Sequence, residues 1–395
     1  MPSLDDDHTG ARIKEQRRLA HLTQKQLAAR LPYSYSLLNQ VECGARAATP
    51  DFVAAVARVL RIDVTALTGQ PYVTELQQDR LAELVRPIRE AMDTYDLGAN
   101  PDVRPRPAAQ LVTAADLLCQ SVRATRLRQA ATELPLLITE LTTAAWSTPT
   151  TDLWRSLAST YRTAHDITVK LGYYDLSSVA LDRMAWAAER ASDPCLSAVR
   201  QYMRALVYFR EGEYSIGQRL IRAGHTLVDD IESRESVAVQ GQLHLGASVI
   251  AARAGARNRN AVDAHLDQAG ECAARTGDAS DVHWLSFGPA NVQLHQMSAA
   301  VEMRLYDDAL GQAREIRLPA SLATSRRAHY LIDRARSEME TGHANAALAS
   351  LVAARKSAPE QTRYHPGARE TISGLVHLAR RTPDTLGHMA AWVGM

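Results

Sequence analysis

Five hydrogen-bonding side chains lie within seven consecutive positions near the start of this sequence. They are Ser34, Tyr35, Ser36, Asn39 and Gln40. If this stretch is a helix, Leu38 and Val41 are three positions apart and share its buried face, which leaves the polar side chains outward. Such side chains hydrogen-bond to base edges and phosphates in the major groove of DNA. The spacing therefore predicts a helix that reads a DNA sequence.

The residues before this polar helix predict another helix, which holds the polar helix in position. Thr23 and Gln26 form a capping box, which starts a helix of about two turns. Pro32 ends that helix because proline has no backbone N–H. Ser34 can cap the next helix, and Gly44 supplies the left-handed residue at its end. The whole pattern is that of a helix-turn-helix.

Three flanking helices are predicted to complete a small domain. The first spans about 11–20, with Ile13 and Leu19 inward. The pair Thr49–Pro50 opens a helix after Gly44, because proline fits the first helical position. Asp63 caps a short fifth helix. These five helices provide enough apolar surface for one core.

Basic residues are concentrated in the same region. The whole chain has a net charge of only +1, so affinity for nucleic acid must come from a local patch. Between residues 10 and 46, seven Lys and Arg side chains stand against two Glu. We expect Arg17 and Lys25 to bind phosphates, and we assign Gln24 and Arg46 to the same DNA-binding surface.

The stretch from about residue 10 to residue 72 resembles the DNA-binding domain shared by lambda-type repressors and the xenobiotic-response-element family. That family has alanine within the first helix of the pair, here Ala28. It has apolar residues at two positions of the recognition helix, here Leu38 and Val41. It ends the second helix on Glu-x-Gly, here Glu42–Gly44. It usually has glycine where this chain has Pro32. The resemblance implies a five-helix domain that binds double-stranded DNA.

Composition and missing motifs limit the other classes of function. Of the 395 residues, 46% are hydrophobic and 23% charged, as in globular proteins. Residues 1–9 are polar and acidic and no apolar run is long enough to span a bilayer, so we expect a cytoplasmic protein without a membrane partner. The four cysteines are far apart, and neither a nucleophile–base pair nor a phosphate-binding motif occurs. We expect no metal, no cofactor and no catalysis.

Two segments are predicted to connect the DNA-binding domain to the rest of the chain. From about Val73 to Leu97 a helix carries apolar residues at mixed spacings of three and four. The run GANPDVRPRP after it breaks the helical pattern and predicts an exposed loop. We therefore divide the chain into a DNA-binding domain at 1–72, a connecting helix and loop at 73–107, and a third region at 108–395.

The third region has helix after helix, and its turns recur roughly every 40 residues. Five segments share one layout, in which a small or polar turn follows one helix and a spaced apolar or alanine series follows the turn. Their turns lie near Gly172, Gly212, Gly255, Arg304 and Gly342. This layout predicts an all-α solenoid of helical hairpins, and it resembles degenerate tetratricopeptide repeats. Such an array has a concave groove lined by the first helix of each hairpin.

Candidate ligand-binding residues come from two observations. The tetratricopeptide resemblance places Arg162, Tyr202, Asn291 and His329 in the groove. The stretch from His283 to Gln296 adds aromatic side chains, which suit a ligand pocket when a few polar groups accompany them. The full candidate set is Arg162, Tyr202, Trp284, Phe287, Asn291, His295 and His329. The alternative is that the aromatic residues only pack and that His295 is an ordinary surface histidine.

Both halves together resemble a regulator family common in antibiotic-producing actinobacteria, whose C-terminal features here include FGPANV from Phe287 and the run from Ala358 to Val376. The resemblance implies a transcriptional regulator whose array senses a peptide or a small molecule. One helix-turn-helix contacts too few base pairs for selectivity, so we expect a homodimer on a roughly palindromic operator. The competing hypothesis is an adaptor, whose solenoid binds a partner protein and whose helix-turn-helix tethers it to DNA.

Overall fold

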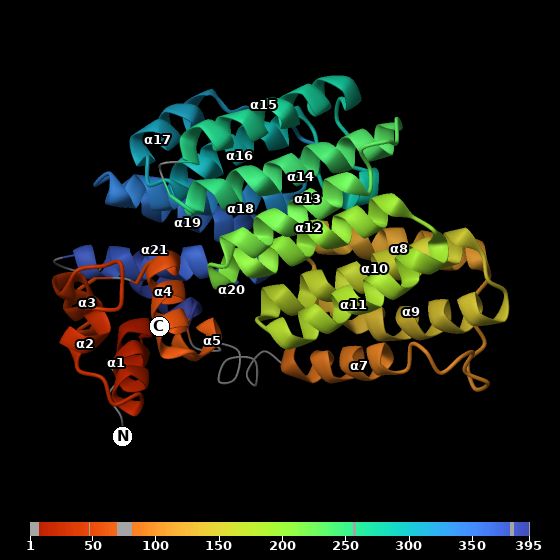
Figure 1. The fold of residues 1–395 in the computed structure, drawn as a ribbon, viewed down its shortest axis with the longest axis horizontal. Helices are drawn as coiled ribbons and strands as arrows, with labels where there is room; N and C mark the ends of the chain where they lie inside the picture. Colours follow the sequence, from red (N-terminus) through yellow and green to blue (C-terminus); the bar gives the residue numbers. More distant parts are fainter. Residues whose placement is uncertain (1–7, 47, 69–80, 256–257, 380–382, 395) are drawn as a thin grey trace.

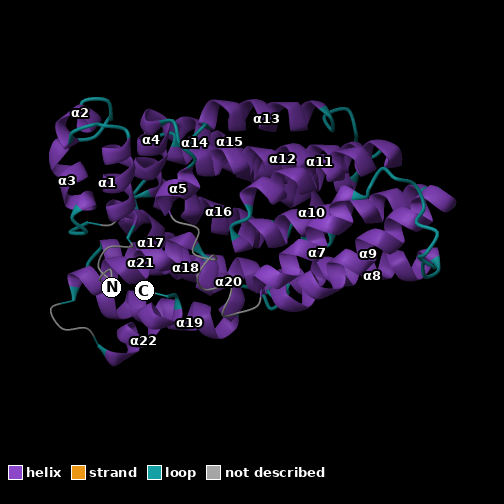
Figure 2. Ribbon diagram, turned by 90° about the horizontal axis from the view of Figure 1, so that it is seen from below, coloured by secondary structure: helices purple, strands orange, loops and turns teal. Residues whose placement is uncertain are grey.

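The computed structural model describes residues 8–46, 48–68, 81–255, 258–379 and 383–394 (Figure 1). Within these ranges the regular structure is helical, and a single isolated bridge pairs Ala279 with Phe287. Figure 2 shows helices joined by loops, without a drawn strand. The predicted all-α class, a helix-turn-helix domain followed by helical repeats, is confirmed for the described part of the chain.

The N-terminal domain has five helices around one small core. They are α1 (Thr9–Leu19), α2 (Gln24–Ala28), α3 (Tyr35–Glu42), α4 (Pro50–Leu60) and α5 (Val64–Thr68). Ile13, Leu27, Leu38, Phe52 and Leu67, one from each helix, are almost completely buried together. Their burial explains why these short segments stay helical, since isolated helices of this length are unstable in water.

The predicted caps of these helices are confirmed. The Thr23 hydroxyl accepts a hydrogen bond from the Gln26 backbone N–H at 3.2 Å, and the Gln26 side chain accepts one from the Thr23 N–H at 2.8 Å. The Ser34 hydroxyl accepts from Leu37 N–H at 3.2 Å, and that of Thr49 accepts from Phe52 N–H at 3.4 Å. The start of each helix is therefore determined by its local sequence.

One core prediction for this domain is wrong. Leu19 is 64% exposed, although we expected it beside Ile13 on the inner face of α1. Six positions on a helix correspond to about 240° of rotation, which carries the side chain round to the solvent side. The residue that shares the inner face with Ile13 is Arg17, four positions on, and it is buried.

The connecting helix packs with the solenoid. It is α7 (Leu81–Asp93), and its Val85, Ile88 and Met92 belong to the large core of the following helices. The predicted start at Val73 and the boundary at 72 lie outside the described residues. The helix ends four residues before the predicted Leu97, and the segment between it and α8 is the expected loop.

The rest of the chain is a series of helical hairpins followed by shorter helices. The hairpins are α8 (Ala108–Arg123) with α9 (Leu127–Ser147), α10 (Thr151–Leu171) with α11 (Tyr174–Ala191), α12 (Pro194–Glu211) with α13 (Tyr214–Thr226), α14 (Arg234–Arg253) with α15 (Arg259–Thr276), α16 (Pro289–Glu302) with α17 (Tyr306–Glu315), and α18 (Thr324–Glu340) with α19 (Ala344–Ser357). The short 3₁₀ helix η3 (Val282–Trp284) precedes α16, and α20 (Pro359–Tyr364), α21 (Pro366–Leu378) and α22 (Asp384–Trp392) follow α19.

The five predicted turns each join the two helices of a hairpin. Gly172, Gly212 and Gly342 have φ values of 83°, 75° and 83°, which favour glycine because it lacks a Cβ. Arg304 adopts φ 63° at the equivalent turn between α16 and α17. Because each turn is local, the hairpins can be recognised from the sequence without knowledge of their packing.

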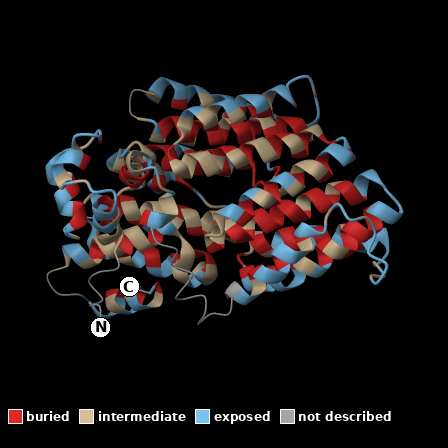
Figure 3. Ribbon diagram, turned by 60° about the horizontal axis from the view of Figure 1, so that its bottom comes forward, coloured by how far each residue is buried: buried red, intermediate tan, exposed pale blue. Residues whose placement is uncertain are grey.

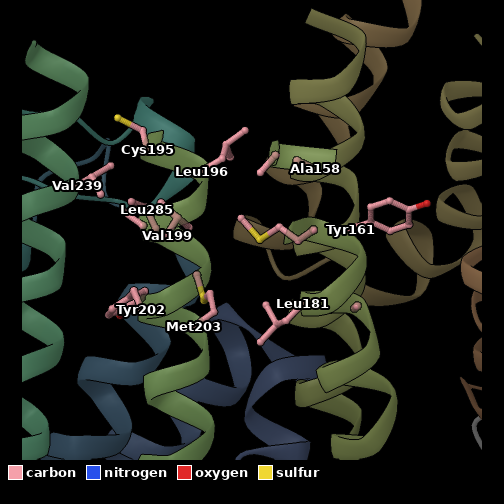
Figure 4. Packing of buried hydrophobic residues seen from close by; sticks show 14 of the residues in the cluster. Ala158, Tyr161, Leu181, Cys195, Leu196, Val199, Tyr202, Met203, Val239 and Leu285 are labelled. Carbon is pink, nitrogen blue, oxygen red and sulfur yellow. The ribbon is translucent and has the colours of Figure 1, made fainter. Parts of the chain in front are cut away.

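Neighbouring hairpins share one continuous core. Figure 3 shows the buried residues concentrated on the faces where solenoid helices meet. In Figure 4, Met203 of α12 and Leu181 of α11 point into the space between two hairpins, while Val199 and Tyr202 lie on the other side of α12. Helix α12 is therefore apolar on two faces, as stacking on both sides requires.

The solenoid closes on itself. Helix α8 packs against α18, and α10 packs against α20, although these pairs are far apart in sequence. The backbone N–H of Arg128 donates to the Glu360 carboxylate at 3.0 Å, and Lys170 Nζ donates to Gln361 Oε1 at 2.9 Å. The first helices of the hairpins, α8, α10, α12, α14, α16 and α18, therefore surround a common interior.

Candidate DNA-binding surface and solenoid interior

Helix α3 presents its predicted polar face to solvent. Ser34, Tyr35, Ser36, Asn39 and Gln40 are all exposed, with Tyr35 at 45%. Lys25 and Arg46 are exposed as well. Figure 1 shows α2 and α3 at the outer edge of the molecule, with α4 between them and the solenoid. This face of α3 can approach DNA without moving the solenoid.

Arg17, which we expected to bind a phosphate, does not belong to that exposed surface and is 7% exposed. Its guanidinium donates to both oxygens of Glu42 at 2.6 and 2.7 Å and to the Leu22 carbonyl at 2.8 Å. The hydrogen bond to Glu42 raises the pKa of Arg17. The pair is buried and joins α1 to the end of α3. Its role is to position the recognition helix.

Gln24 extends this network toward the DNA-facing side. Its amide nitrogen donates to Glu42 at 2.8 Å, and its amide oxygen accepts from the Tyr35 hydroxyl at 3.2 Å. The side chain is half-buried between α2 and α3. Gln24 therefore fixes the two helices of the motif relative to each other.

The predicted basic patch is smaller in the folded domain than in the sequence. Arg17 pairs with Glu42, and Arg12 donates to the Leu67 and Thr68 carbonyls at 2.9 and 2.7 Å, where it caps α5. The other five basic side chains are exposed. They are Lys14, Arg18, Lys25, Arg30 and Arg46. They can supply the salt-dependent, sequence-independent part of DNA affinity.

The solenoid binds this domain through α4. Arg58 donates to the Gly212 carbonyl at 2.7 Å and to Glu213 at 3.0 Å, at the turn between α12 and α13. A Cβ on Gly212 would lie 2.8 Å from the Cβ of Ala54, closer than such atoms approach. The glycine therefore serves both the turn and the contact with α4.

Asp51, in the first turn of α4, is the polar centre of the same contact. It accepts a hydrogen bond from the Tyr214 hydroxyl at 2.9 Å, and it lies 3.9 Å from Arg253 and 3.7 Å from Arg304. Arg253 also forms two hydrogen bonds of 2.6 Å with Glu302 at the end of α16. The first turn of α4 is thus connected to α14 and α16.

Three side chains form a polar group on α16 and α18 in the solenoid interior. Arg326 donates to Asn291 Oδ1 at 2.9 Å, and a second nitrogen lies 3.3 Å from His295 Nδ1. Burial, together with Arg326, lowers the pKa of His295 well below its usual value, so this imidazole is neutral. Asn291 is 1% exposed, and its amide nitrogen has no partner among the described residues. The alternative of a surface histidine is excluded by the 6% exposure of His295.

Arg162 fixes the segment before α16. It donates to the carbonyls of His283 and Trp284, the latter at 3.2 Å, and is 1% exposed. His283, Trp284 and Ser286 have φ values of 44°, 54° and 61°, a left-handed conformation that is unfavourable for such residues. Arg162 contributes to holding this segment in place.

The two predicted aromatic residues have different environments. Phe287 is fully buried, and a Cβ on Gly241 of α14 would lie 2.1 Å from its ring, so Phe287 is a packing residue and not a pocket wall. The spacing could not show this, because it depends on a glycine in a distant helix. Trp284 is half-buried and donates from its ring N–H to Asp116 on α8 at 3.2 Å.

Tyr202 and His329 complete the predicted set. The Tyr202 hydroxyl accepts from Gln242 at 2.8 Å, and the side chain is buried. His329 lies 3.1 Å from His365 and 3.6 Å from Asp333, and 36% of its side chain remains exposed. Tyr202, Asn291, His295 and His329 lie on α12, α16 and α18, which are first helices of their hairpins.

A mixed set of potential metal ligands also comes together, although the sequence spacing gave no sign of it. Asp193, Cys195, Glu235 and His283 have ligand atoms within 4.8 Å of one another. Arg155 pairs with Asp193 at 2.5 Å and with Glu235 at 2.7 Å. Burial and these carboxylates raise the pKa of Cys195 to about 12, which disfavours the thiolate that binds metals. Asp193 and Glu235 thus already pair with Arg155, and His283 lies 2.8 Å from Glu235.

The comparisons with known proteins bear on the N-terminal domain. The sequence profile of a helix-turn-helix domain family matches residues 8–68. No curated protein and no solved structure matches the chain. Among the described residues, none of the helices is both long and apolar enough to span a bilayer. Residues 8–68, which contain α1 to α5 and the exposed face of α3, are a helix-turn-helix domain.

Proposed function

We propose that this protein is a sequence-specific DNA-binding transcriptional regulator, without catalytic activity, whose solenoid senses a small-molecule or peptide ligand. The observation that carries the proposal is the docking of the helix-turn-helix domain. Its α4 binds the solenoid, while the polar face of α3 stays free for DNA. A solenoid that only tethered a partner protein would not need several polar contacts to the DNA-binding domain.

Helix α16 supports a route from ligand to DNA. Asn291 and His295 face the interior near its start, and Glu302 at its end pairs with Arg253, which lies beside Asp51 of α4. A helix of this length spans about 20 Å and moves as one unit. A ligand that displaced Arg326 from Asn291 would therefore act on the end of the helix that contacts the DNA-binding domain.

The ligand changes DNA affinity only if it binds one arrangement of the solenoid better than another. Small rotations between neighbouring hairpins add up along such an array. We further propose a homodimer, in which these rotations set the separation of two α3 helices. Adjacent major grooves on one face of DNA are about 34–36 Å apart, so a modest change in separation weakens binding.

Genomic footprinting of the full-length protein tests the proposal, with and without an extract of its own cells. We expect protected sites with approximate two-fold symmetry, and their occupancy should change with the extract. Sedimentation of the protein on one such site should give two copies for each operator. Absence of discrete sites would refute the regulator hypothesis. If the occupancy of discrete sites does not change with any extract and a stable protein partner is recovered, the adaptor hypothesis is favoured.

The Asn291→Ala variant tests the sensing part on the sites so identified. We expect loss of the response to extract, because the variant lacks the Asn291 Oδ1 acceptor from which the ligand would displace Arg326. A matched control is Ser298→Ala on the same helix, which removes the hydroxyl that donates to Asp333 at 2.6 Å. A response that survives in Asn291→Ala would move the ligand site away from α16.

A further inference from the structure

Four basic side chains converge on the interior of the solenoid from three different helices. They are Arg123 on α8, Arg162 and Lys170 on α10, and Arg326 on α18. Arg162 and Lys170 are eight positions apart and so share one face of α10 with Asp166 between them. Arg123 hydrogen-bonds to Asp166, and Arg162 lies 3.9 Å from the same carboxylate.

The electrostatic influence of these groups on one another shows that they share one region. Burial lowers the pKa of Lys170 to about 8, a value that includes the raising effect of Asp166 and the lowering effects of Arg123 and Arg326. Burial and Arg123 lower the pKa of Arg162 to about 10. The charged and titratable groups around Lys170 are Asp166 on α10, Arg123 on α8, Arg326 and His329 on α18, and His365 before α21.

The group carries more positive than negative charge. Arg123, Arg162 and Lys170 interact with the Asp166 carboxylate, whereas Arg326 interacts with Asp333, which lies farther along α18 beside Ser298 and His329. Two positive charges remain even when both carboxylates are counted as ionised. Uncompensated charge in a protein interior is costly, so a structure that keeps it has a use for it.

Several hydrogen-bond donors in this region have no acceptor among the described residues. The amide nitrogen of Asn291 and the Nε–H groups of Arg123 and Arg162 are buried and unpaired. The Tyr202 hydroxyl accepts from Gln242, which leaves its own proton free to donate. An anion supplies the acceptor that each of these donors lacks, although Gln242 Oε1, on the amide that donates to Tyr202, is itself a buried acceptor without a partner among the described residues.

Solvent reaches this region even though protein surrounds it. Burial, Arg326 and Lys170 lower the pKa of His329 to about 3, yet 36% of its side chain is exposed. The side chains of Arg123 and Asp166 are 21% and 14% exposed, respectively. Solvent therefore reaches the group at His329 and Arg123, whereas Arg162 and Asn291 are each 1% exposed, so a solute that binds their donors must displace protein contacts.

We propose that the solenoid interior binds a small organic anion with at least two negative charges, held by Arg123, Arg162, Arg326 and the amide of Asn291. This inference rests on the proposed function, because it identifies the chemical class of the effector. Arginine suits the role, since its fixed fork of donors matches both carboxylate and phosphate oxygens. The bound anion competes with Asn291 Oδ1 for Arg326, at the start of the α16 route to the DNA-binding domain.

Titration calorimetry on the full-length protein tests the site with two probes. Inorganic pyrophosphate represents phosphate ligands, tricarballylate represents carboxylate ligands, and acetate is the monoanion control. We expect one or both polyanions to bind in the interior and acetate to bind far more weakly. If neither polyanion binds, the proposal is overturned.

Variants locate the binding. Arg326→Gln should weaken the bound probe at least about tenfold, because a charge-assisted hydrogen bond is worth about 1.5–3 kcal/mol. Arg222→Gln removes the same charge from the exposed face of α13 and should change affinity less than about twofold. If Arg326→Gln does not fold, Asn291→Ala gives the answer without a change of charge. Equal effects of the interior and exposed variants would mean that the anion binds nonspecifically and would overturn the proposal.

Operator binding measured on the same samples separates this inference from the proposed function. If a probe binds in the interior and the operator affinity is unchanged, the anion site stands and the sensing role of this site is wrong. If no polyanion binds and cell extract still shifts operator occupancy, the regulator function stands and the anion site is wrong.

Discussion

Replacement of Arg17 by methionine should strongly destabilise the helix-turn-helix domain, because Arg17 is buried on the inner face of α1. The substitution leaves the Glu42 carboxylate, whose side chain is 1% exposed, with the 2.8 Å hydrogen bond from Gln24 as its remaining side-chain partner. Removing one partner of a buried ion pair costs about 3–5 kcal/mol. A domain of roughly 60 residues has about 3–9 kcal/mol in total, so most of its stability is at stake.

Hydrogen exchange measured by mass spectrometry on the full-length protein reports this loss locally. A cost of about 3–5 kcal/mol corresponds to roughly 10²–10³·⁵-fold faster exchange in α1 and α3, because each 1.4 kcal/mol is a factor of ten. Arg18→Met is the matched control, since it removes a neighbouring exposed charge. The double variant Arg17→Met with Glu42→Leu should recover much of the protection, because an apolar pair of similar volume often replaces a buried ion pair without loss.

The same variant distinguishes this role from binding to a phosphate. If Arg17 bound a phosphate, its replacement would reduce the slope of log affinity against log salt by about 0.9. For the molecules of the variant that remain folded, we expect this slope to equal that of the wild type. If Arg17→Met exchanges hydrogen at the wild-type rate and its salt slope is reduced by about 0.9, the structural role of Arg17 is refuted.

Three further predictions concern the recognition helix, the domain contact and the interior. Asn39→Ala should weaken a cognate operator by about 1–3 kcal/mol with little effect on random DNA, and equal losses on both would exclude base reading. Tyr214→Phe removes the hydroxyl that donates to Asp51 and should speed hydrogen exchange in α4 about tenfold or more; unchanged exchange would mean that the contact adds no stability. Tricarballylate keeps a constant charge above about pH 7. Its affinity should therefore fall as pH rises from 7 to 9, because Lys170 loses its proton near pH 8. In the Lys170→Met variant the affinity should not change over this pH range.

The local features of this fold could be predicted from the sequence, because each depends on residues a few positions apart. The caps at Thr23, Ser34 and Thr49 and the turns at Gly172 and Gly342 are of this kind. Helical spacing also gave the polar face of α3. The error at Leu19 came from misapplied spacing, and the same spacing applied to Ile13 would have indicated that Arg17 is buried.

The rest depends on contacts between distant segments, which spacing cannot show. Phe287 packs against Gly241, and Arg162 binds carbonyls more than a hundred positions away. The basic group of the interior has one local sign, the charged series Arg162, Asp166 and Lys170 along an otherwise buried helix. Its completion by Arg326 follows from the closure of the solenoid. The division of the chain into domains at 72 and 107 stays a prediction.

The closure of the solenoid also limits how this protein can evolve. An open array can gain or lose a hairpin at either end, because each hairpin contacts only its neighbours. Here the contacts of α8 with α18 and of α10 with α20 fix the number of hairpins in the ring. A duplicated or deleted hairpin would separate Lys170 from Gln361 and open the interior. Changes in ligand preference must therefore arise by substitution on the inner helices, while repeat number stays constant.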